Sequence, residues 1–244
     1  MSCVLVIGST SDIGNALAKK FLTKGFNVIL AAKDTVLLNN QKEELVMSFP
    51  KRDIQIAPFN GDQFHSHLSF YNGLHKQPDG VITVMGYLGE QKVSELSLKE
   101  SMNVINVNYV GNVSILNVIA NDFEKRGSGF IIGVSSVAGD RGRQSNYIYG
   151  SAKAGFTSYL SGLRNRLFGK GVSVLTVCPG FIETKMTQHL KLPSLLTSSP
   201  TFVADAIYKA HQKKKDIIYV KPIWRFIMIV ICLIPEPIFK RLKL

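Results

Sequence analysis

Tyr149 and Lys153 are the two residues of this sequence whose types and spacing best suit acid–base chemistry. They open residues 149–169, a segment with a helical pattern, and a spacing of four places both side chains on one helical face. A free phenol has a pKa of ~10 and is a poor acid or base near neutrality. A lysine ammonium beside it favours the phenolate, so we expect a lowered pKa and proton transfer at working pH.

A Tyr-x-x-x-Lys pair alone is better explained as an ordinary pair on a helix surface. Three further features precede it in a meaningful order and change that interpretation. They are a glycine turn at residues 8–14, Asn108 after a strand–helix crossover, and Ser136 at the end of an apolar strand. Strand ends are where ligands bind in open α/β sheets, so these residues are candidates for one site.

The glycine turn joins the first apolar strand to the first helix. Glycines let a backbone approach a pyrophosphate closely, and the helix N-terminus offers it free N–H groups and a positive dipole end. The spacing is G-x-x-x-x-x-G rather than G-x-G-x-x-G, and Asp12 lies where a third glycine is common. The candidate phosphate-binding residues are Gly8, Ser9, Thr10, Ser11, Asp12, Ile13 and Gly14.

The elements that must position these residues alternate between apolar strands and helices. Strands are predicted at residues 2–8, 26–32, 53–60, 80–86, 129–136, 172–180 and 216–222, and helices at 9–25, 34–49, 64–75, 98–125, 149–169 and 200–213. Residues 98–125 could be one helix or two, and residues 185–199 read as an irregular loop over the substrate. Continuous apolar strands between helices predict an α/β fold, a three-layer doubly wound parallel sheet of about seven strands.

Length and cysteine usage favour one domain in a reducing compartment. The 244 residues fit a single domain at 1–220, followed by a basic, apolar tail at 221–244. Cys3, Cys178 and Cys232 are odd in number and far apart, so neither a disulfide framework nor a metal site is predicted. The first residues enter a strand directly, without a signal-peptide pattern, which favours the cytoplasm.

The net charge of +12 is concentrated near the C-terminus, where residues 209–244 hold nine Lys or Arg and two acidic residues. This excess indicates an anionic surface or substrate, or serves solubility alone. No nucleic-acid motif accompanies it, so nucleic acid is not a predicted partner. The apolar residues 226–235 are too few for the ~20 that span a bilayer. Their basic flanks suit either peripheral contact with an anionic membrane or, alternatively, a helix packed on the domain or a subunit.

Together the motifs resemble those of the short-chain dehydrogenase/reductase family, across nearly the whole chain. Its TGxxxGIG turn is matched by GSTSDIG, its Asn motif by NVNYVG, its Ser and YxxxK motifs by VSSVAG and YGSAK, and its PGxxxT segment by CPGFIET. The resemblance implies a Rossmann fold and NAD(P)H-dependent reduction of a ketone. It also implies a homodimer or homotetramer.

The resemblance assigns roles to individual residues. It makes Tyr149 the proton donor, with Lys153 lowering its pKa and holding the nicotinamide ribose. Ser136, thirteen residues before Tyr149, would position the carbonyl, with Ser135 as the alternative. Asn108 would hold a water of the proton relay. The segment that would meet the nicotinamide carboxamide comprises Pro179, Gly180, Ile182 and Thr184.

The adenosine side departs from the family pattern. The family's NNAG is Thr83-Val84-Met85-Gly86 here, which keeps Gly86, and Asn60 or Asp62 is expected to border the adenine. At the end of the second strand an acidic residue would favour NADH, but Ala32 is followed by Lys33, which could pair with a 2′-phosphate. NADPH is therefore favoured over NADH, although the adjacent Asp34 confuses the register and Lys33 could be an ordinary solvated lysine.

A narrower resemblance concerns the substrate. MGYLGE, SSVAGDRGRQSNYIYGSAKAG, PGFIETKMTQHLK and the tail are similar to the bacterial decaprenylphosphoryl 2-keto-pentose reductases, which complete a 2′-epimerisation in cell wall biosynthesis. It implies a lipid-linked phosphosugar ketone, an oxidase partner and a position at the inner face of the cytoplasmic membrane. Arg141 and Arg143 are candidates for binding the substrate phosphate, or belong to a solvated loop. The alternatives are reduction of another hydrophobic ketone, steroid or acyl, and a non-catalytic nucleotide-binding protein.

Overall fold

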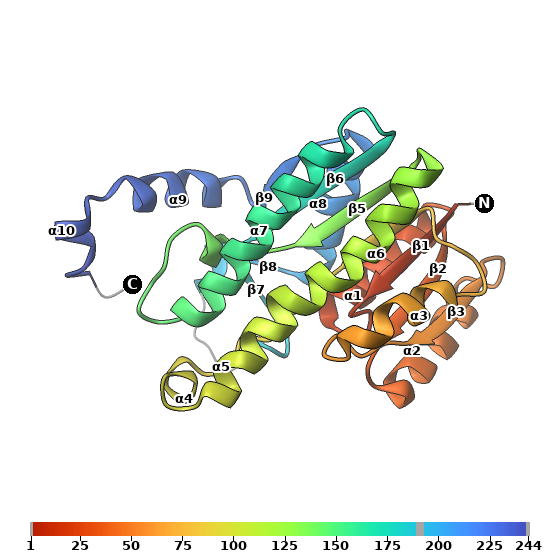
Figure 1. The fold of residues 1–244 in the computed structure, drawn as a ribbon, viewed down its shortest axis with the longest axis horizontal. Helices are drawn as coiled ribbons and strands as arrows, with labels where there is room; N and C mark the ends of the chain where they lie inside the picture. Colours follow the sequence, from red (N-terminus) through yellow and green to blue (C-terminus); the bar gives the residue numbers. More distant parts are fainter. Residues whose placement is uncertain (1, 189–192, 243–244) are drawn as a thin grey trace.

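The centre of the computed structural model, which describes residues 2–188 and 193–242, is a seven-stranded parallel sheet. Its strand order is β3-β2-β1-β4-β5-β6-β9 (Figure 1). The strands are β1 (Cys3–Ile7), β2 (Asn27–Ala32), β3 (Ile54–Pro58), β4 (Gly80–Thr83), β5 (Gly129–Val134), β6 (Val172–Pro179) and β9 (Ile217–Val220). All six pairings within it are parallel. The predicted doubly wound sheet is confirmed.

Both faces of the sheet are buried, which explains why the strands read as unbroken apolar runs. In β1, Val4 and Val6 contribute to one core cluster, and Leu5 and Ile7 to the cluster on the opposite face. The first cluster packs on α1 (Asp12–Thr23), α2 (Thr35–Ser48) and α8 (Pro200–Gln212), and the second on α3 (His67–Asn72), α6 (Gly111–Arg126) and α7 (Tyr147–Leu167). The result is a three-layer sandwich.

The order of the strands determines where a ligand can bind. The chain runs outward from β1 through β2 to β3, and then returns to place β4 on the other side of β1. A crevice therefore lies at the topological switch point, between the connections that leave the carboxyl ends of β1 and β4. This is the usual ligand position in such sheets. The glycine turn follows β1, and Val84, Met85 and Gly86 follow β4.

Several local predictions differ from the structure. Residues 98–125 form one continuous helical path of α5 (Leu98–Ile105), a π-helical turn (Asn106–Val110) and α6. Residues 64–75 form only a 3-10 turn (Phe64–Ser66) and α3, and α4 (Gln91–Leu96) was not predicted. The predicted irregular loop contains a 3-10 turn (Ser194–Leu196) and β8 (Thr197–Ser198), which pairs with β7 (Phe181–Ile182). Residues 189–192 of that loop lie outside the described residues.

The tail continues as α9 (Ile223–Leu233) and α10 (Glu236–Phe239), which extend away from the sandwich (Figure 1). Trp224 and Met228 of α9 are buried in a small cluster with Val137 and Cys178. Across residues 2–188 and 193–242, the structure contains no helix with the length and hydropathy needed to span a bilayer.

Candidate active site

Helix α7 places Tyr149 and Lys153 in its first two turns, on the side that faces the sheet. The Nζ of Lys153 lies 5.8 Å from the centroid of the Tyr149 ring. Lys153 is almost fully buried, and its Nζ donates hydrogen bonds to the carbonyl of Val134 at 3.2 Å and to that of Met85 at 3.4 Å. The ammonium thus bridges the carboxyl ends of two neighbouring strands beside the phenol, and the predicted pairing of these side chains is confirmed by the geometry.

The electrostatics of the pair differ from the sequence-based expectation. Burial raises the pKa of Tyr149 to about 12, opposed by a hydrogen bond to Ser136. Burial lowers the pKa of Lys153 to about 8. The predicted lowering of the Tyr149 pKa is therefore wrong for this structure, because desolvation of the buried phenolate outweighs the hydrogen bond to Ser136. The site holds Tyr149 as a protonated phenol, the form that can donate a proton.

The structure separates the two candidate serines after β5. The Ser136 hydroxyl bonds with Tyr149, and its Oγ accepts from the backbone N–H of Ala138 at 3.1 Å. Ser135 instead donates to the backbone carbonyl of Lys153 at 3.0 Å and lies 2.6 Å from the Thr157 hydroxyl. Ser136 therefore faces the phenol, whereas Ser135 fastens the end of β5 to α7.

Asn108 lies fully buried in the π-helical turn. Its Nδ2 donates to the carbonyls of Tyr87 at 2.6 Å and Val104 at 2.8 Å, and its Oδ1 accepts from the Tyr87 N–H at 3.3 Å. A Cβ on Gly86 would lie 3.3 Å from this Oδ1 and 3.5 Å from the Lys153 Nζ. Asn108 thus holds the segment after β4 against Lys153. Its role toward a water stays a prediction.

Sequence reasoning missed Asn112, which supports this arrangement. The Thr83 hydroxyl at the end of β4 donates to the Asn112 Oδ1, and the Asn112 Nδ2 donates to the carbonyl of Val107 at 3.0 Å. A five-residue step of this kind fits a π-helical turn, a geometry common at functional sites. Asparagines at 108 and 112 were visible in the sequence as an i, i+4 pair, but a polar residue inside a helix gives no sign of which carbonyl it will reach.

A cavity of about 220 Å³ opens at the switch point, where the sequence predicts adenosine binding. Its lining joins the glycine turn to the ends of β2, β3 and β4 and comprises Gly8, Thr10, Ser11, Ala32, Lys33, Phe59, Asn60, Gly61, Asp62, Val84, Met85, Gly86 and Val107. Gly8 has a φ of +83°, which a side chain would strain. Gly61 was not among the predicted site residues. A Cβ there would lie 2.8 Å from the Met85 Sδ. The glycines of the lining keep the cavity open at the place where adenosine binding is predicted.

Further contacts hold the glycine turn in shape around this cavity. Ser9 is buried, and its carbonyl accepts from the Gln41 Nε2 at 2.8 Å. A Cβ on Gly14 would overlap the carbonyl of Gly8, so only glycine allows α1 to approach the turn this closely. Ser11 caps α1 by accepting from the N–H of Gly14 at 3.1 Å. Ile13 follows in the first turn of α1, whose N-terminus begins at the rim of the cavity.

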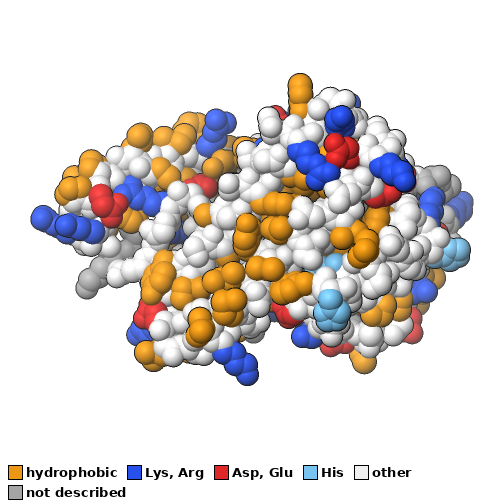
Figure 2. Space-filling model, in the orientation of Figure 1, with side chains coloured by type: hydrophobic (Ala, Val, Ile, Leu, Met, Phe, Trp, Pro, Cys, Tyr) orange, Lys and Arg blue, Asp and Glu red, His pale blue; other side chains and the backbone are white. Residues whose placement is uncertain are grey.

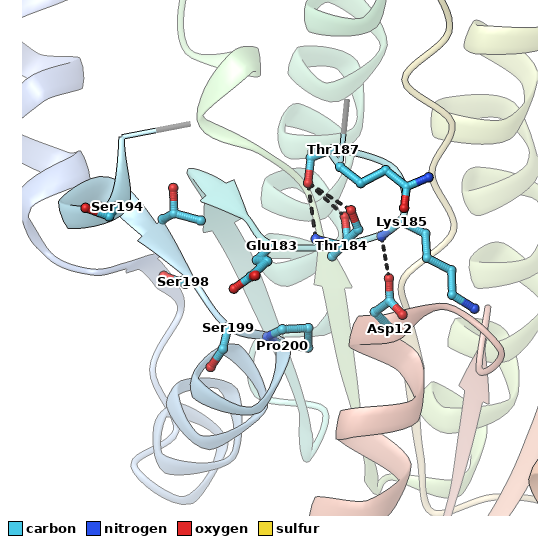
Figure 3. A pocket seen from close by; sticks show the side chains of 11 residues that line it. Asp12, Glu183, Thr184, Lys185, Thr187, Ser194, Ser198, Ser199 and Pro200 are labelled. Atoms are coloured by element: carbon cyan, nitrogen blue, oxygen red, sulfur yellow. Dashed lines mark hydrogen bonds between the residues drawn. The ribbon is translucent and has the colours of Figure 1, made fainter. Parts of the chain in front are cut away.

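A second cavity, of about 680 Å³, lies between the α1 N-terminus and the segment that follows β7 (Figure 3). Asp12, Glu183, Thr184 and Lys185 are among its lining residues. The Asp12 carboxylate accepts from the backbone N–H of Lys185 at 2.8 Å. Asp12 therefore ties the glycine turn to the expected nicotinamide segment, a function that its place in the motif did not reveal.

The remaining residues of that segment occupy different environments. Thr184 lines the second cavity, and its N–H donates to the Thr187 hydroxyl at 3.2 Å. Ile182 is buried in β7, while Pro179 ends β6. Gly180 is covered by α9, since a Cβ there would overlap the indole of Trp224.

The structure does not bring Arg141 to the site. Its Nη1 donates to the carbonyls of Ile231 at 2.7 Å and Ile234 at 2.6 Å, and its Nη2 pairs with Glu236 at 2.9 Å. The guanidinium also stacks on Phe239, 3.7 Å from the ring centroid. These long-range contacts make Arg141 an anchor of the tail rather than a free phosphate ligand.

Arg143 has a different environment. It is partly buried, and burial lowers its pKa against the opposing effect of Asp140. Within the described residues its Nε is buried without a hydrogen-bond partner. Arg143 therefore remains the candidate for an anionic substrate group.

Comparison with known proteins places this geometry in a family. Residues 2–193 match the family model described as short chain dehydrogenase. An uncharacterized oxidoreductase of Mycobacterium tuberculosis is 31% identical over 98% of this chain and 96% of its own length, and one of Streptomyces coelicolor is 29% identical over 98% and 95%. The chain belongs to the short-chain dehydrogenase family.

Solved structures of this family share the fold. A short-chain dehydrogenase from Sphingobium yanoikuyae in complex with NADPH aligns with a TM-score of 0.82 at 19% identity, covering 91% of this chain and 88% of its own. One from Burkholderia cenocepacia in complex with NADP aligns with a TM-score of 0.84 at 20% identity, covering 100% and 98%. As a short-chain dehydrogenase, the chain is an NAD(P)-dependent oxidoreductase.

The two serines of this short-chain dehydrogenase should respond differently to substitution. Ser136→Ala is expected to lower kcat/KM by ~10²-fold, since it removes a hydroxyl aimed at the reacting oxygen. Ser135→Ala should leave kcat/KM close to wild type but lower the free energy of unfolding by ~1–2 kcal/mol, because the Thr157 hydroxyl loses its buried partner. Cofactor oxidation and urea unfolding of both variants measure this. A large loss of kcat/KM in Ser135→Ala with near-normal activity in Ser136→Ala would instead make Ser135 the catalytic serine.

Proposed function

We propose that this enzyme reduces a ketone to an alcohol with NADPH, and that the ketone is the 2-keto group of a polyprenylphosphoryl pentose. The observation that carries the reductase assignment is a phenol kept protonated by burial, at Tyr149, beside a buried ammonium and a serine hydroxyl. In the reducing direction a proton must reach the carbonyl oxygen, and a phenol in its acid form is ready to supply it.

The residues of the site divide the work of this reaction. When bound, the reduced nicotinamide supplies a hydride to the carbonyl carbon. Ser136 donates a hydrogen bond to the carbonyl oxygen, and Tyr149 transfers its proton there as negative charge develops. The ammonium of Lys153 then stabilises the phenolate left on Tyr149, which returns to its acid form by taking a proton from solvent.

NADPH is proposed rather than NADH because of the charge at the end of β2. Lys33 lines the adenosine-side cavity, and its Nζ lies 4.0 Å from the Asp62 carboxylate. Ala32 leaves the preceding position without an acidic side chain for the ribose hydroxyls. A lysine at this point can pair with a 2′-phosphate. Structural neighbours in complex with NADPH and NADP support this choice.

The substrate proposal rests on the narrower sequence resemblance and on charge. Arg143 follows Ser136 on the loop that leads to α7, and a partly buried guanidinium with an unused N–H suits a phosphate. A product of this kind would serve arabinose-donor synthesis for a cell wall. The proposal requires an oxidase that makes the ketone, in the cytoplasm or at the inner face of the membrane.

A substrate panel tests the proposal. Oxidation of NADPH and NADH is measured with a polyprenylphosphoryl 2-keto-pentose, a 3-keto-acyl thioester and a steroid ketone. We expect the highest kcat/KM with the phosphosugar and NADPH. A higher value with the acyl or steroid ketone would replace the proposed substrate, and no oxidation with any of the three would favour the non-catalytic alternative.

Lys33→Ala serves as the cofactor control in the same panel. Removal of the ammonium should lower kcat/KM with NADPH by ~10-fold and leave the value with NADH unchanged, because only NADPH carries the 2′-phosphate. Lys170 is exposed and lies just before β6, at the amino ends of the strands and away from the cofactor cavity at their carboxyl ends. Lys170→Ala should therefore change neither value. An equal loss with both cofactors for Lys33→Ala would contradict the assignment of NADPH.

A further inference from the structure

Helix α9 is apolar on its outer face as well as on its inner face. Its inner face buries Trp224 and Met228, which are 3% and 2% exposed. On the outer face Phe226, Val230 and Leu233 are 67%, 63% and 75% exposed, and Arg225 is the one charged residue of the helix. A helix at the surface of a soluble protein normally turns a polar face to water. This outer face therefore needs a partner that the described residues do not supply.

The apolar surface continues beyond α9. We define the tail face as Ile223, Phe226, Ile229, Val230 and Leu233 of α9 with Ile238 of α10, all of them exposed. Figure 2 shows hydrophobic side chains gathered on this projecting part of the molecule, with basic side chains beside them. Large contiguous apolar patches on soluble proteins mark sites of interaction.

The tail face is held in a fixed position. The Trp224 Nε1 donates to the carbonyl of Leu196 at 3.1 Å, and its ring packs edge-on against Phe181. At the other end of α9, Arg141 binds the carbonyls of Ile231 and Ile234, which are the groups that a helix C-terminus leaves without partners. These contacts order the helix while its apolar outer side faces solvent, so the exposure is not that of a loose chain end.

The charges around the tail face are positive. Arg225, Lys240 and Arg241 are exposed, while Glu236, the one acidic residue among residues 221–242, is neutralised by Arg141. A two-fold contact with a second copy would bring this cationic surface against itself. An anionic surface would instead neutralise it.

The dimensions of α9 favour contact in the plane of a bilayer. Its eleven residues extend about 17 Å at 1.5 Å per residue, well short of the ~30 Å hydrocarbon core. An apolar face of this length with basic neighbours is typical of a helix that lies in the headgroup region.

We propose that the tail face docks on an anionic lipid surface, with α9 lying in the plane of the interface. The indole of Trp224 covers Gly180 in the expected nicotinamide segment, and Arg141 belongs to the loop that follows Ser136. Docking through α9 therefore brings both of these segments close to the lipid. The proposal concerns the tail alone and holds for any ketone substrate.

Vesicle binding of the full chain tests the proposal without any substrate. Sedimentation is measured with vesicles of phosphatidylcholine alone and of phosphatidylcholine mixed with phosphatidylglycerol. Wild type should bind the mixed vesicles, bind the neutral ones more weakly, and dissociate as salt rises. The triple variant Phe226→Ser, Val230→Ser, Leu233→Ser should bind at least about tenfold more weakly.

A matched control removes equally exposed apolar side chains elsewhere. Leu96, Leu98 and Phe168 are 92%, 78% and 86% exposed, and their combined substitution by serine should leave vesicle binding at the wild-type level. Circular dichroism and cofactor binding confirm that both triple variants fold. Arg225→Glu with Arg241→Glu provides a second test that leaves the apolar face intact, and it should abolish the preference for phosphatidylglycerol.

Three outcomes would overturn the proposal. The first is a wild-type protein that does not sediment with the mixed vesicles. The second is equal binding by wild type and the tail triple variant. The third is a wild-type dimer that dissociates in the tail triple variant while neither protein binds lipid, which would assign the tail face to a second copy of the chain.

Discussion

Tyr149→Phe is expected to lower kcat/KM for ketone reduction by ~10²–10⁴-fold, the range that removal of a general acid produces. Phenylalanine keeps the ring that packs near the Lys153 Nζ but has no proton to transfer to the carbonyl oxygen. The protein already holds the phenol in its acid form, since burial raises its pKa to about 12. Phenylalanine has no proton to give at any pH, so a change of pH should not restore the lost activity.

Steady-state NADPH oxidation and NADPH binding by fluorescence separate chemistry from cofactor affinity for Tyr149→Phe. The dissociation constant for NADPH should change little, because the phenol acts on the ketone. Tyr147→Phe, two residues earlier at the exposed start of α7, is the matched control and should retain wild-type activity. Near-normal reduction by Tyr149→Phe would remove this residue from the catalytic role and with it the proposed reaction.

Lys153→Met is expected to lower kcat/KM by ~10²-fold or more and to change the pH dependence of the reaction. The ammonium stabilises the phenolate that forms when Tyr149 gives up its proton. Burial lowers the pKa of Lys153 to about 8, so the cation is present below that pH and is lost above it. In wild type, kcat/KM should be constant below about pH 8 and should fall as the pH rises further.

The pH profile of kcat/KM, measured for wild type and Lys153→Met, tests this assignment. The variant has no group titrating at this position, so its low activity should lack the fall near pH 8. Urea unfolding shows whether the variant is intact, and methionine should be tolerated because Lys153 packs beside the ring of Phe156. A fall near pH 8 that persists in Lys153→Met would assign it to another group.

The sequence predicted the sheet well because its strands are buried on both faces. Alternating residues of β1, such as Val4 and Leu5, serve opposite clusters and are both apolar, so the run is continuous and easy to recognise. The pairing of Tyr149 with Lys153 was equally accessible, since a four-residue spacing in a helix fixes a shared face.

Other features depend on contacts that spacing does not encode. The direction of the Tyr149 pKa shift depends on how deeply the phenol is buried, which follows from packing around α7 rather than from the i+4 lysine. Arg141 finds partners 90 to 95 residues away in the tail, so its place near Ser136 in the sequence gave the wrong impression of its surroundings. Asp12 likewise reaches Lys185, far along the chain.

The contacts of Arg141 also bear on where this enzyme can be shortened. If the chain were to end after β9, this guanidinium would lose the carbonyls of Ile231 and Ile234, the carboxylate of Glu236 and the ring of Phe239. Val137, which directly follows Ser136, would lose the cover of Trp224 and Met228 in the same step. Although α9 and α10 project from the sandwich, they brace the stretch of backbone that carries the reactive hydroxyl.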